Sequence, residues 1–277
     1  MKSKLKKLQW HPAFCSATEL ELREDKKNLT FIREHSLTKA PLKIDLMVIL
    51  KKPGIKIKNE IGHIFKTHNI VEYKSPNDTL NIDDYFKSLA YVCLYKAQGK
   101  HVDEIPFEEL SLTLVYDSKP IKLIDKLRKS GLEVTEKYKG IYYITGNPSI
   151  PNQQIVTTSE LGSLHFLLKA ISRKFETNDL LKLANFAENA KNQNDKFNLD
   201  SLLQVSFLAN SKVYNVLRKE NTMCEAFFDL FKDEIAAKIA AAENVVRAEA
   251  KEKEKKSAVK IKALEKEIAE LKKKLAS

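Results

Sequence analysis

The sequence is poor in cysteine and has no long apolar run. Three cysteines, Cys15, Cys93 and Cys224, stand far apart among 277 residues, and no two have CxxC spacing. This argues against a structural zinc site or a disulfide framework, and a reducing cytoplasm is the expected compartment. The apolar runs are too short to cross a bilayer. The basic N-terminus has no apolar segment typical of a signal peptide, so no membrane partner is expected.

Several enzyme signatures are also missing. Six histidines are scattered without HxH or HExxH spacing, which disfavours a zinc enzyme. No GxSxG, Walker A or GxGxxG motif is present. Seven glycines in the whole chain leave little room for a loop that cradles phosphate. Serine hydrolases, P-loop NTPases and dinucleotide enzymes are therefore not indicated.

Positive charge is abundant but unevenly distributed. The formal net charge is +11, with +4 in residues 1–9 and +5 in residues 250–277, which leaves +2 for the body between them. A basic protein suggests a nucleic-acid partner. The near-neutral body equally fits a protein with solvated basic ends. Charge alone leaves both interpretations open.

Hydrophobic periodicity predicts an α/β protein that begins in the order αβββαβ. An additional α/β stretch follows, and from about residue 159 the pattern is helical. The segments expected are a basic tail (1–10), the core (11–117), an α/β extension (118–158), a helical region (159–231) and a long helix (232–277). Within the core, residues 81–100 are expected to form a helix with Asn81 as its N-cap and Gly99 as its C-cap. Its predicted buried face is Phe86, Leu89, Ala90, Cys93 and Ala97.

The C-terminal end has a short heptad pattern. The apolar positions are Ile261, Leu264, Ile268, Leu271 and Leu275. In a parallel, in-register dimer Lys260 would face Glu265, and Glu267 would face Lys272. A homodimer through residues 257–277 is one expectation. A single solvated helix with pairs such as Glu270 and Lys274 is the other.

Charged residues interrupt two of the predicted strands. Side-chain alternation along "HNIVEYK" places His68, Ile70, Glu72 and Lys74 on one face of residues 68–74. Asp45 interrupts the apolar strand "KIDLMVI", where an ionised carboxylate is costly unless it is paired or binds a cation. Two carboxylates beside a lysine form an oxygen-rich site that suits Mg2+, and Mn2+ is an alternative. His68 shares this face, but a hydrogen-bonded structural role is expected for it.

With these three residues on strands of an αβββαβ order, the sequence resembles the PD-(D/E)XK, or restriction-endonuclease-like, nuclease superfamily. The phrases "WHPAF", "KIDLMVI", "NEIGHIFKTHNIVEYKSPNDTLNIDDYFKSLAYVCLYK" and "GIYYITG" look like a bacterial branch labelled PD-(D/E)XK transposase or recombination-promoting nuclease. The resemblance spans about residues 10–160. One departure is that Asp45 follows Lys43-Ile44 rather than proline.

The resemblance implies a central mixed sheet flanked by helices, and a Mg2+ site. It implies Asp45, Glu72 and the main-chain carbonyl of Tyr73 as ligands, with Lys74 assisting the attacking water. A further glutamate from the first helix is often added, and Glu21, on the core-facing side, matches better than Glu19, which is expected to be solvated.

The expected function is Mg2+-dependent hydrolysis of DNA phosphodiester bonds by a metal-activated water. The catalytic residues would be Asp45, Glu72, Lys74 and Glu21. The alternative belongs to another class: a catalytically silent nuclease fold that serves as a binding or assembly module and self-associates through its C-terminal coiled coil.

Overall fold

The protein is described by a computed structural model that covers residues 10–36, 43–50, 52 and 54–214. The chain divides into two compact units, Met1–Met223 and Cys224–Ser277, and every described residue belongs to the first.

Some sequence predictions concern residues outside this description. Residues 1–9 of the basic tail, the long helix from residue 232 and the heptads of residues 257–277 lie outside the described residues, whereas Trp10, which was assigned to the tail, begins the first helix. The coiled-coil homodimer therefore stays a prediction.

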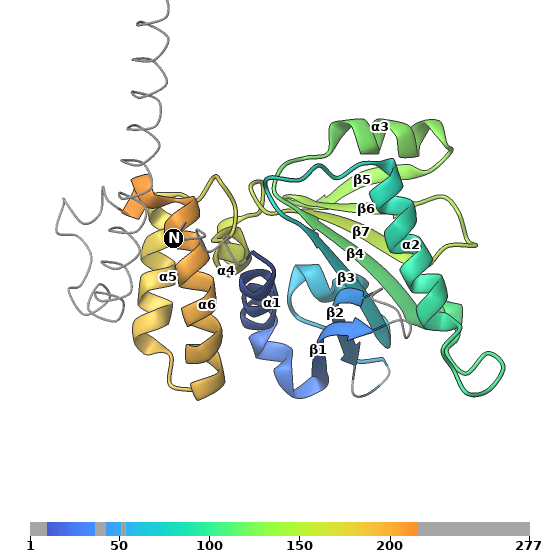
Figure 1. The fold of residues 1–277 in the computed structure, drawn as a ribbon, viewed down its shortest axis with the longest axis horizontal. Coiled ribbons are helices and arrows are strands. Elements are labelled where there is room, and N and C mark those ends of the chain that lie inside the picture. The colour runs from blue at the N-terminus through green and yellow to red at the C-terminus, as the bar shows by residue number, and fades with distance from the viewer. Residues whose placement is uncertain (1–9, 37–42, 51, 53, 215–277) are drawn as a thin grey trace, which may run out of the picture. The chain divides into compact units, whose positions relative to one another are not determined.

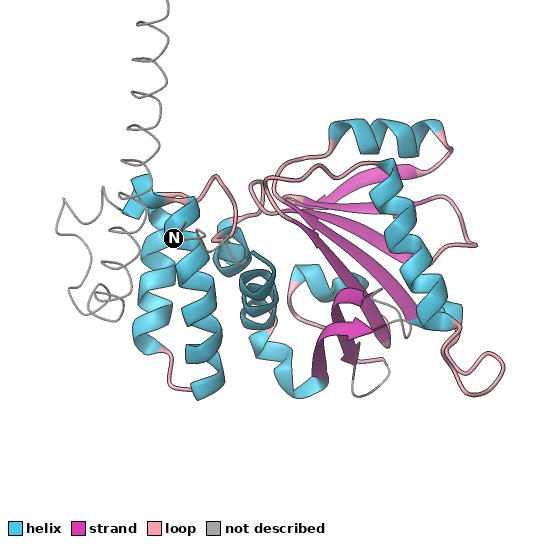
Figure 2. Ribbon diagram, viewed as in Figure 1, coloured by secondary structure: helices cyan, strands magenta, loops and turns pink. Residues whose placement is uncertain are grey.

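The described residues form an α/β structure with seven strands and six α-helices (Figure 2). The helices are α1 (Trp10–Glu21), α2 (Ile82–Lys96), α3 (Ile121–Lys129), α4 (Phe166–Lys169), α5 (Thr177–Asn189) and α6 (Gln193–Ala209). The strands are β1 (Leu29–Ser36), β2 (Lys43–Leu50), β3 (His68–Lys74), β4 (Leu110–Tyr116), β5 (Glu133–Tyr138), β6 (Ile141–Thr145) and β7 (Asn152–Thr157). Four 3-10 turns are η1 (Arg23–Asn28), η2 (Glu60–Ile64), η3 (Phe107–Glu109) and η4 (Ser163–His165). Apart from these turns, the predicted order αβββαβ is confirmed.

All seven strands belong to one mixed sheet in the order β1-β2-β3-β4-β7-β6-β5. β2 runs antiparallel to both β1 and β3, whereas β3, β4 and β7 are parallel. β5 and β6 form a hairpin, and β6 joins β7 in antiparallel pairing. The sheet therefore brings β2 and β3, which carry the predicted site residues, side by side.

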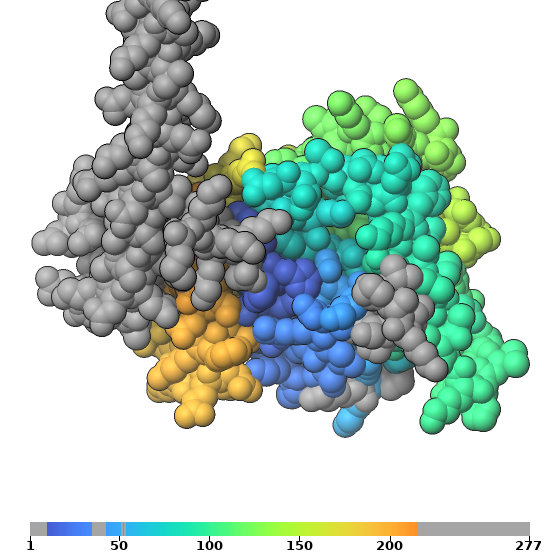
Figure 3. Space-filling view, in the orientation of Figure 1, coloured from blue at the N-terminus to red at the C-terminus, as the bar shows by residue number. Residues whose placement is uncertain are grey.

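Helices cover the two faces of the sheet (Figure 1). α2 and α3 lie on one face, where Tyr85, Tyr91 and Leu123 join a buried cluster with strand residues such as Ile70 and Leu112. α1 lies on the other face, and α4 and α6 pack against it. Figure 3 shows side chains of α6 next to those of the N-terminal elements.

The start of α2 agrees with the prediction, but its buried face does not. The Asn81 side chain accepts hydrogen bonds from the backbone N–H groups of Asp83 and Asp84, and the Asp84 carboxylate accepts the Asn81 backbone N–H, which completes a capping box. The predicted buried face is wrong, because Phe86 is 57% exposed and Cys93 is also exposed. The side chains that face the sheet are Tyr85, Ser88, Tyr91, Val92 and Tyr95. Tyrosine rings bury their apolar bodies while the hydroxyls keep polar partners, and this moves the buried stripe around the helix.

The end of α2 also differs from the prediction. The helix ends at Lys96, and Ala97 occupies the C-cap position that was expected for Gly99. The Ala97 backbone N–H still bonds back to the Cys93 carbonyl, so the last turn closes without a left-handed glycine.

Candidate functional site

Asp45 and Glu72 lie together where β2 and β3 separate. The β2–β3 ladder ends at Leu46 and Val71, so the next pair in register, Asp45 and Glu72, lies just beyond it. Beyond the last pair of the ladder, two hydrogen bonds between a backbone N–H and a side-chain carboxylate connect the strands. The Asp45 backbone N–H donates to Glu72 Oε1 at 3.2 Å, and the Tyr73 backbone N–H donates to Asp45 Oδ2 at 2.8 Å. The two carboxylates therefore stabilise the point where the strands part.

The backbone of β1 is unusual opposite Asp45. β1 and β2 pair from Leu29 to Ser36, and the one position that drops out of this run is Glu34 opposite Asp45. Glu34 has a φ of 49°, which is rare for a residue with a side chain. Such backbone strain often accompanies functional sites, and it persists only where the surroundings enforce it. Asp45 is therefore outside the regular strand pairing both toward β1 and toward β3.

Glu72 titrates far above its ordinary range. Burial raises the pKa of its carboxyl to about 8, and the nearby charge of Asp45 adds to the rise. The hydrogen bond from the Asp45 backbone and the charges of Lys87 and Lys74 act in the opposite direction. At neutral pH Glu72 is therefore largely protonated in the absence of a cation. A cation bound beside both carboxylates would displace that proton.

Lys74 lies on the α2 side of the sheet. Its Nζ lies 2.7 Å from Asp84 Oδ1 of α2. The other Asp84 oxygen accepts the backbone N–H of Asn81 and completes the helix cap. Asp84 therefore caps α2 and orients Lys74 at the same time.

His68 also faces α2, at the opposite end of β3. The Tyr95 hydroxyl lies 2.8 Å from His68 Nδ1, and the two rings are tilted against each other. Burial lowers the pKa of His68 below its ordinary value. The expectation that this histidine is a hydrogen-bonded structural residue is confirmed.

The first turns of α1 reach Asp45 with residues that the sequence reasoning did not single out. His11 Nε2 lies 2.8 Å from Asp45 Oδ1, and Cys15 Sγ lies 3.8 Å from the Asp45 carbonyl. Between them, the Phe14 ring stacks on Tyr73 with 4.5 Å between centroids. The contact with Asp45 raises the pKa of His11, although burial opposes the charged form. His11, Phe14 and Cys15 are three and four residues apart, so they share one face of the helix. This spacing is the sequence signal that could have grouped them.

Glu21 lies at the far end of α1 and is bound into a different buried network. Its Oε1 lies 2.6 Å from His165 Nδ1 and accepts the Asn59 side-chain amide at 3.0 Å. Its Oε2 accepts the Leu168 backbone N–H, and His165 Nε2 contacts Glu60 at 3.0 Å. The expectation that Glu21 faces the core is confirmed. These contacts join it to η2, η4 and α4 and not to Asp45.

Glu19 is not solvated as expected. Its carboxylate accepts Arg33 Nε at 2.7 Å and the Asn198 amide at 3.2 Å, and only 15% of its side chain is exposed. Arg33 also donates to Asn198 at 2.9 Å, so this cluster joins α1, β1 and α6. A residue 179 positions away in the chain supplies one of the partners. No local pattern could reveal such a contact.

The donor atoms at Asp45 and Glu72 suit a hard divalent cation. Carboxylates retain lone pairs beyond the hydrogen bonds described above. Within the described residues, no group of three or more His, Cys, Asp or Glu side chains is arranged to hold a metal ion. Mg2+ is commonly bound by one or two carboxylates and keeps several waters, so two carboxylates are sufficient for it. The carbonyl of Tyr73 as a further ligand stays a prediction.

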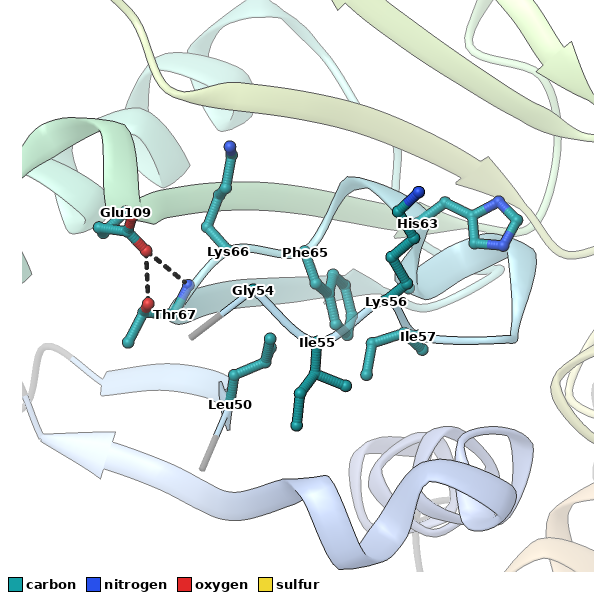
Figure 4. Close-up of a pocket in the computed structure, with 11 residues that line it drawn as sticks. Leu50, Gly54, Ile55, Lys56, Ile57, His63, Phe65, Lys66, Thr67 and Glu109 are labelled. Carbon is teal, nitrogen blue, oxygen red and sulfur yellow. Dashed lines mark hydrogen bonds between the residues drawn. The ribbon is translucent and has the colours of Figure 1, made fainter. Parts of the chain in front are cut away.

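A cavity of about 500 Å³ lies at the other end of β2 and β3 (Figure 4). Glu109 accepts hydrogen bonds from the backbone and hydroxyl of Thr67 at its wall. Its lining also includes Leu50, Ile55, Ile57, Phe65, Lys56, Lys66 and His63. Thr67 and Glu72 are five residues apart along an extended chain, roughly 16 Å. The cavity is therefore separate from the carboxylate pair.

Comparison with known proteins adds no identification. No protein-family model, no curated protein and no solved structure matches this chain. In the part of the chain that the structure describes, no helix is both long enough and apolar enough to span a membrane.

Proposed function

We propose that the protein is a metal-dependent nuclease that hydrolyses DNA phosphodiester bonds in the cytoplasm. The observation that carries this proposal is the pairing of Asp45 and Glu72 where β2 and β3 separate, with the pKa of Glu72 raised to about 8. Two carboxylates that repel each other in a partly buried site favour the binding of a divalent cation. The resemblance to the PD-(D/E)XK superfamily supports the same residues.

Each residue has a distinct role in this proposal. Asp45 and Glu72 hold Mg2+, or Mn2+ in its place. When bound, the ion polarises the phosphodiester and lowers the pKa of a water molecule. Lys74, oriented by Asp84, lies on the Glu72 face and offsets negative charge that develops on the phosphate. The resemblance implies that the bond between phosphorus and the 3′ oxygen breaks: the hydroxyl of water goes to phosphorus and its proton to the 3′ oxygen, leaving a 5′-phosphate and a 3′-hydroxyl.

Positive charge near the site favours a polyanionic substrate. Lys87 of α2 and Lys74 of β3 both act on the Glu72 carboxyl. Lys87 is exposed and lies over the Tyr91 ring. Because lysine contacts with phosphate supply most nonspecific affinity for DNA, Lys87 is suited to a backbone contact beside the reacting group.

The test is cleavage of supercoiled plasmid by the purified full-length protein in Mg2+, in Mn2+ or in EDTA. We expect nicked or linear DNA with either metal and none in EDTA. Glu72→Gln removes the carboxylate that would bind the cation but keeps a hydrogen-bond acceptor for the Asp45 backbone, and it should abolish cleavage. Glu188→Gln makes the same change on the exposed surface of α5 and should cleave normally. Cleavage that survives Glu72→Gln would refute the proposed site.

A second candidate function is a catalytically silent binding or assembly module. It is favoured by one specific observation: Asp45, Glu72 and Lys74 each have a partner within the fold, either a backbone N–H or Asp84. Such contacts can be purely structural. This candidate predicts no cleavage and no divalent-cation binding, while DNA binding or self-association persists.

A further inference from the structure

α1 places one face of its first turns over the carboxylate site. His11, Phe14 and Cys15 are three and four residues apart, so they project from the same side of the helix. Phe14 stacks on Tyr73 with an interplanar angle of 9°, and this anchors the helix to β3 beside Glu72. The Cys15 contact with the Asp45 carbonyl anchors it to β2. His11 is thereby held against the Asp45 side chain.

The Asp45 carboxylate is held from two directions. Tyr73 donates its backbone N–H to Oδ2 at 2.8 Å, and His11 Nε2 lies 2.8 Å from Oδ1. The His11 Nε2 atom is buried and has no hydrogen bond of regular geometry among the described residues, so its contact with Asp45 is a close approach of ion-pair length. Contacts to both oxygens limit rotation of the carboxylate. They still leave lone pairs for a cation, because an ionised carboxylate accepts about four hydrogen bonds.

We propose that His11 is a positioning residue that holds Asp45 in the orientation that binds the divalent cation. This inference rests on the proposed function. In this inference the residue of α1 that supports the cation site is His11, whereas the resemblance implies Glu21. Glu21 lies ten residues further along the helix, roughly 15 Å away, where His165 and Asn59 engage it.

The inference follows from how carboxylate ligands are supported in metal sites. Groups that hydrogen-bond to a ligating side chain fix its orientation, and their loss weakens metal binding without removing a ligand. A histidine that merely packed against β2 would have no effect on cation affinity once the protein is folded. Cation affinity is therefore the quantity that separates the two roles.

The test is Mn2+ binding to the full-length protein, measured by calorimetric titration and by the electron paramagnetic resonance signal of free Mn2+. His11→Leu retains bulk but removes the polar contact, and we expect a dissociation constant about 10–100-fold higher than that of the unaltered protein. His11→Gln offers an amide donor in place of the imidazole and should recover part of the loss. His101→Leu, at an exposed loop position, is the matched control and should bind normally.

The outcomes distinguish this inference from the proposed function. If His11→Leu binds Mn2+ as tightly as the unaltered protein, the positioning role is refuted while the metal site stands. If the unaltered protein binds no Mn2+, or if Glu72→Gln binds it equally well, both are overturned. Thermal unfolding in EDTA identifies a variant that fails to fold. If His11→Leu fails to fold, the comparison is between His11→Gln and His11→Ala. The inference is overturned if His11→Gln binds Mn2+ no more tightly than His11→Ala.

Discussion

Lys74 and Asp84 form an ion pair of 2.7 Å between β3 and the first turn of α2. The same aspartate caps the helix through its second oxygen, so the position of the lysine is tied to the start of α2. Since the helix also packs on the sheet through Tyr85, the ammonium group is held by elements that the core already fixes. A lysine placed in this way is suited to act on a substrate phosphate without first being ordered.

We predict that Asp84→Asn lowers the rate of plasmid cleavage about 10-fold, in line with other orienting partners. The amide oxygen can still accept the Asn81 N–H, so the cap survives, but the charge that holds Lys74 is lost. The free energy of unfolding should fall by at most about 1 kcal/mol, because the pair is partly exposed. Asp83→Asn, at the exposed neighbouring position, is the control. Equal cleavage rates for the two variants would contradict an orienting role for Asp84.

Glu72 should make the stability of the metal-free protein depend on pH. The folded-state pKa of about 8 lies above the ordinary value of 4.5. The stabilisation from its proton is therefore fully present below pH 4.5 and is lost as the pH rises through 8. Glu72→Gln does not titrate. We expect it to unfold with the same free energy as the unaltered protein at pH 4.5 and to be more stable by about 1–3 kcal/mol at pH 9.

The measurement is urea unfolding in EDTA at a series of pH values. Glu188→Gln should run parallel to the unaltered protein throughout. If the difference between Glu72→Gln and the unaltered protein stayed constant from pH 4.5 to pH 9, Glu72 would have an ordinary pKa in the folded state, and the electrostatic argument for a cation would fail.

Divalent cations should stabilise the folded protein through the same pair. At 100 times the dissociation constant, a ligand that binds only the folded state adds about 2.7 kcal/mol. For a unit of this size, each kcal/mol shifts the melting temperature by about 2–4 °C. We therefore expect Mg2+ or Mn2+ to raise the melting temperature of the unaltered protein by several degrees at pH 7.5. EDTA should reverse the rise, and Asp45→Asn should abolish it. An equal rise in Asp45→Asn would indicate a different cation site.

Alternation and capping signals were sufficient to predict several features of the fold. The shared face of β3 is confirmed by His68 against Tyr95 and by Lys74 against Asp84, both partners being in α2. Strand alternation has a period of two, so a shift of the strand by one residue would have placed each of these side chains on the opposite face of the sheet. The Asn81 cap was likewise readable because its partners lie within three residues.

Contacts that form between distant segments could not be read in this way. His11 meets Asp45 only when α1 packs across the sheet, and the helical face that it shares with Phe14 and Cys15 does not indicate which strand residue it will contact. Glu21 and His165 are 144 positions apart. The buried face of α2 was misassigned because apolar and tyrosine residues occur around the whole helix, so periodicity did not select one stripe. In each case tertiary packing decides among options that local sequence leaves equal.

The role of Glu21 gives a direct comparison between the family resemblance and the observed contacts. Both its oxygens accept hydrogen bonds within a buried network with His165, Asn59 and the Leu168 backbone. We therefore predict that Glu21→Gln lowers the free energy of unfolding by about 1–3 kcal/mol, because a buried hydrogen-bonded charge is removed. Below the unfolding transition, the cleavage rate should be unchanged.

Glu72→Gln provides the opposite pattern, with cleavage reduced by at least about 100-fold, since a lost cation ligand removes several kcal/mol of transition-state stabilisation. If Glu21→Gln instead reduced cleavage as severely as Glu72→Gln while stability in urea stayed the same, Glu21 would be a ligand of the catalytic cation, as the resemblance implies. The network with His165 would then have to open when the cation binds.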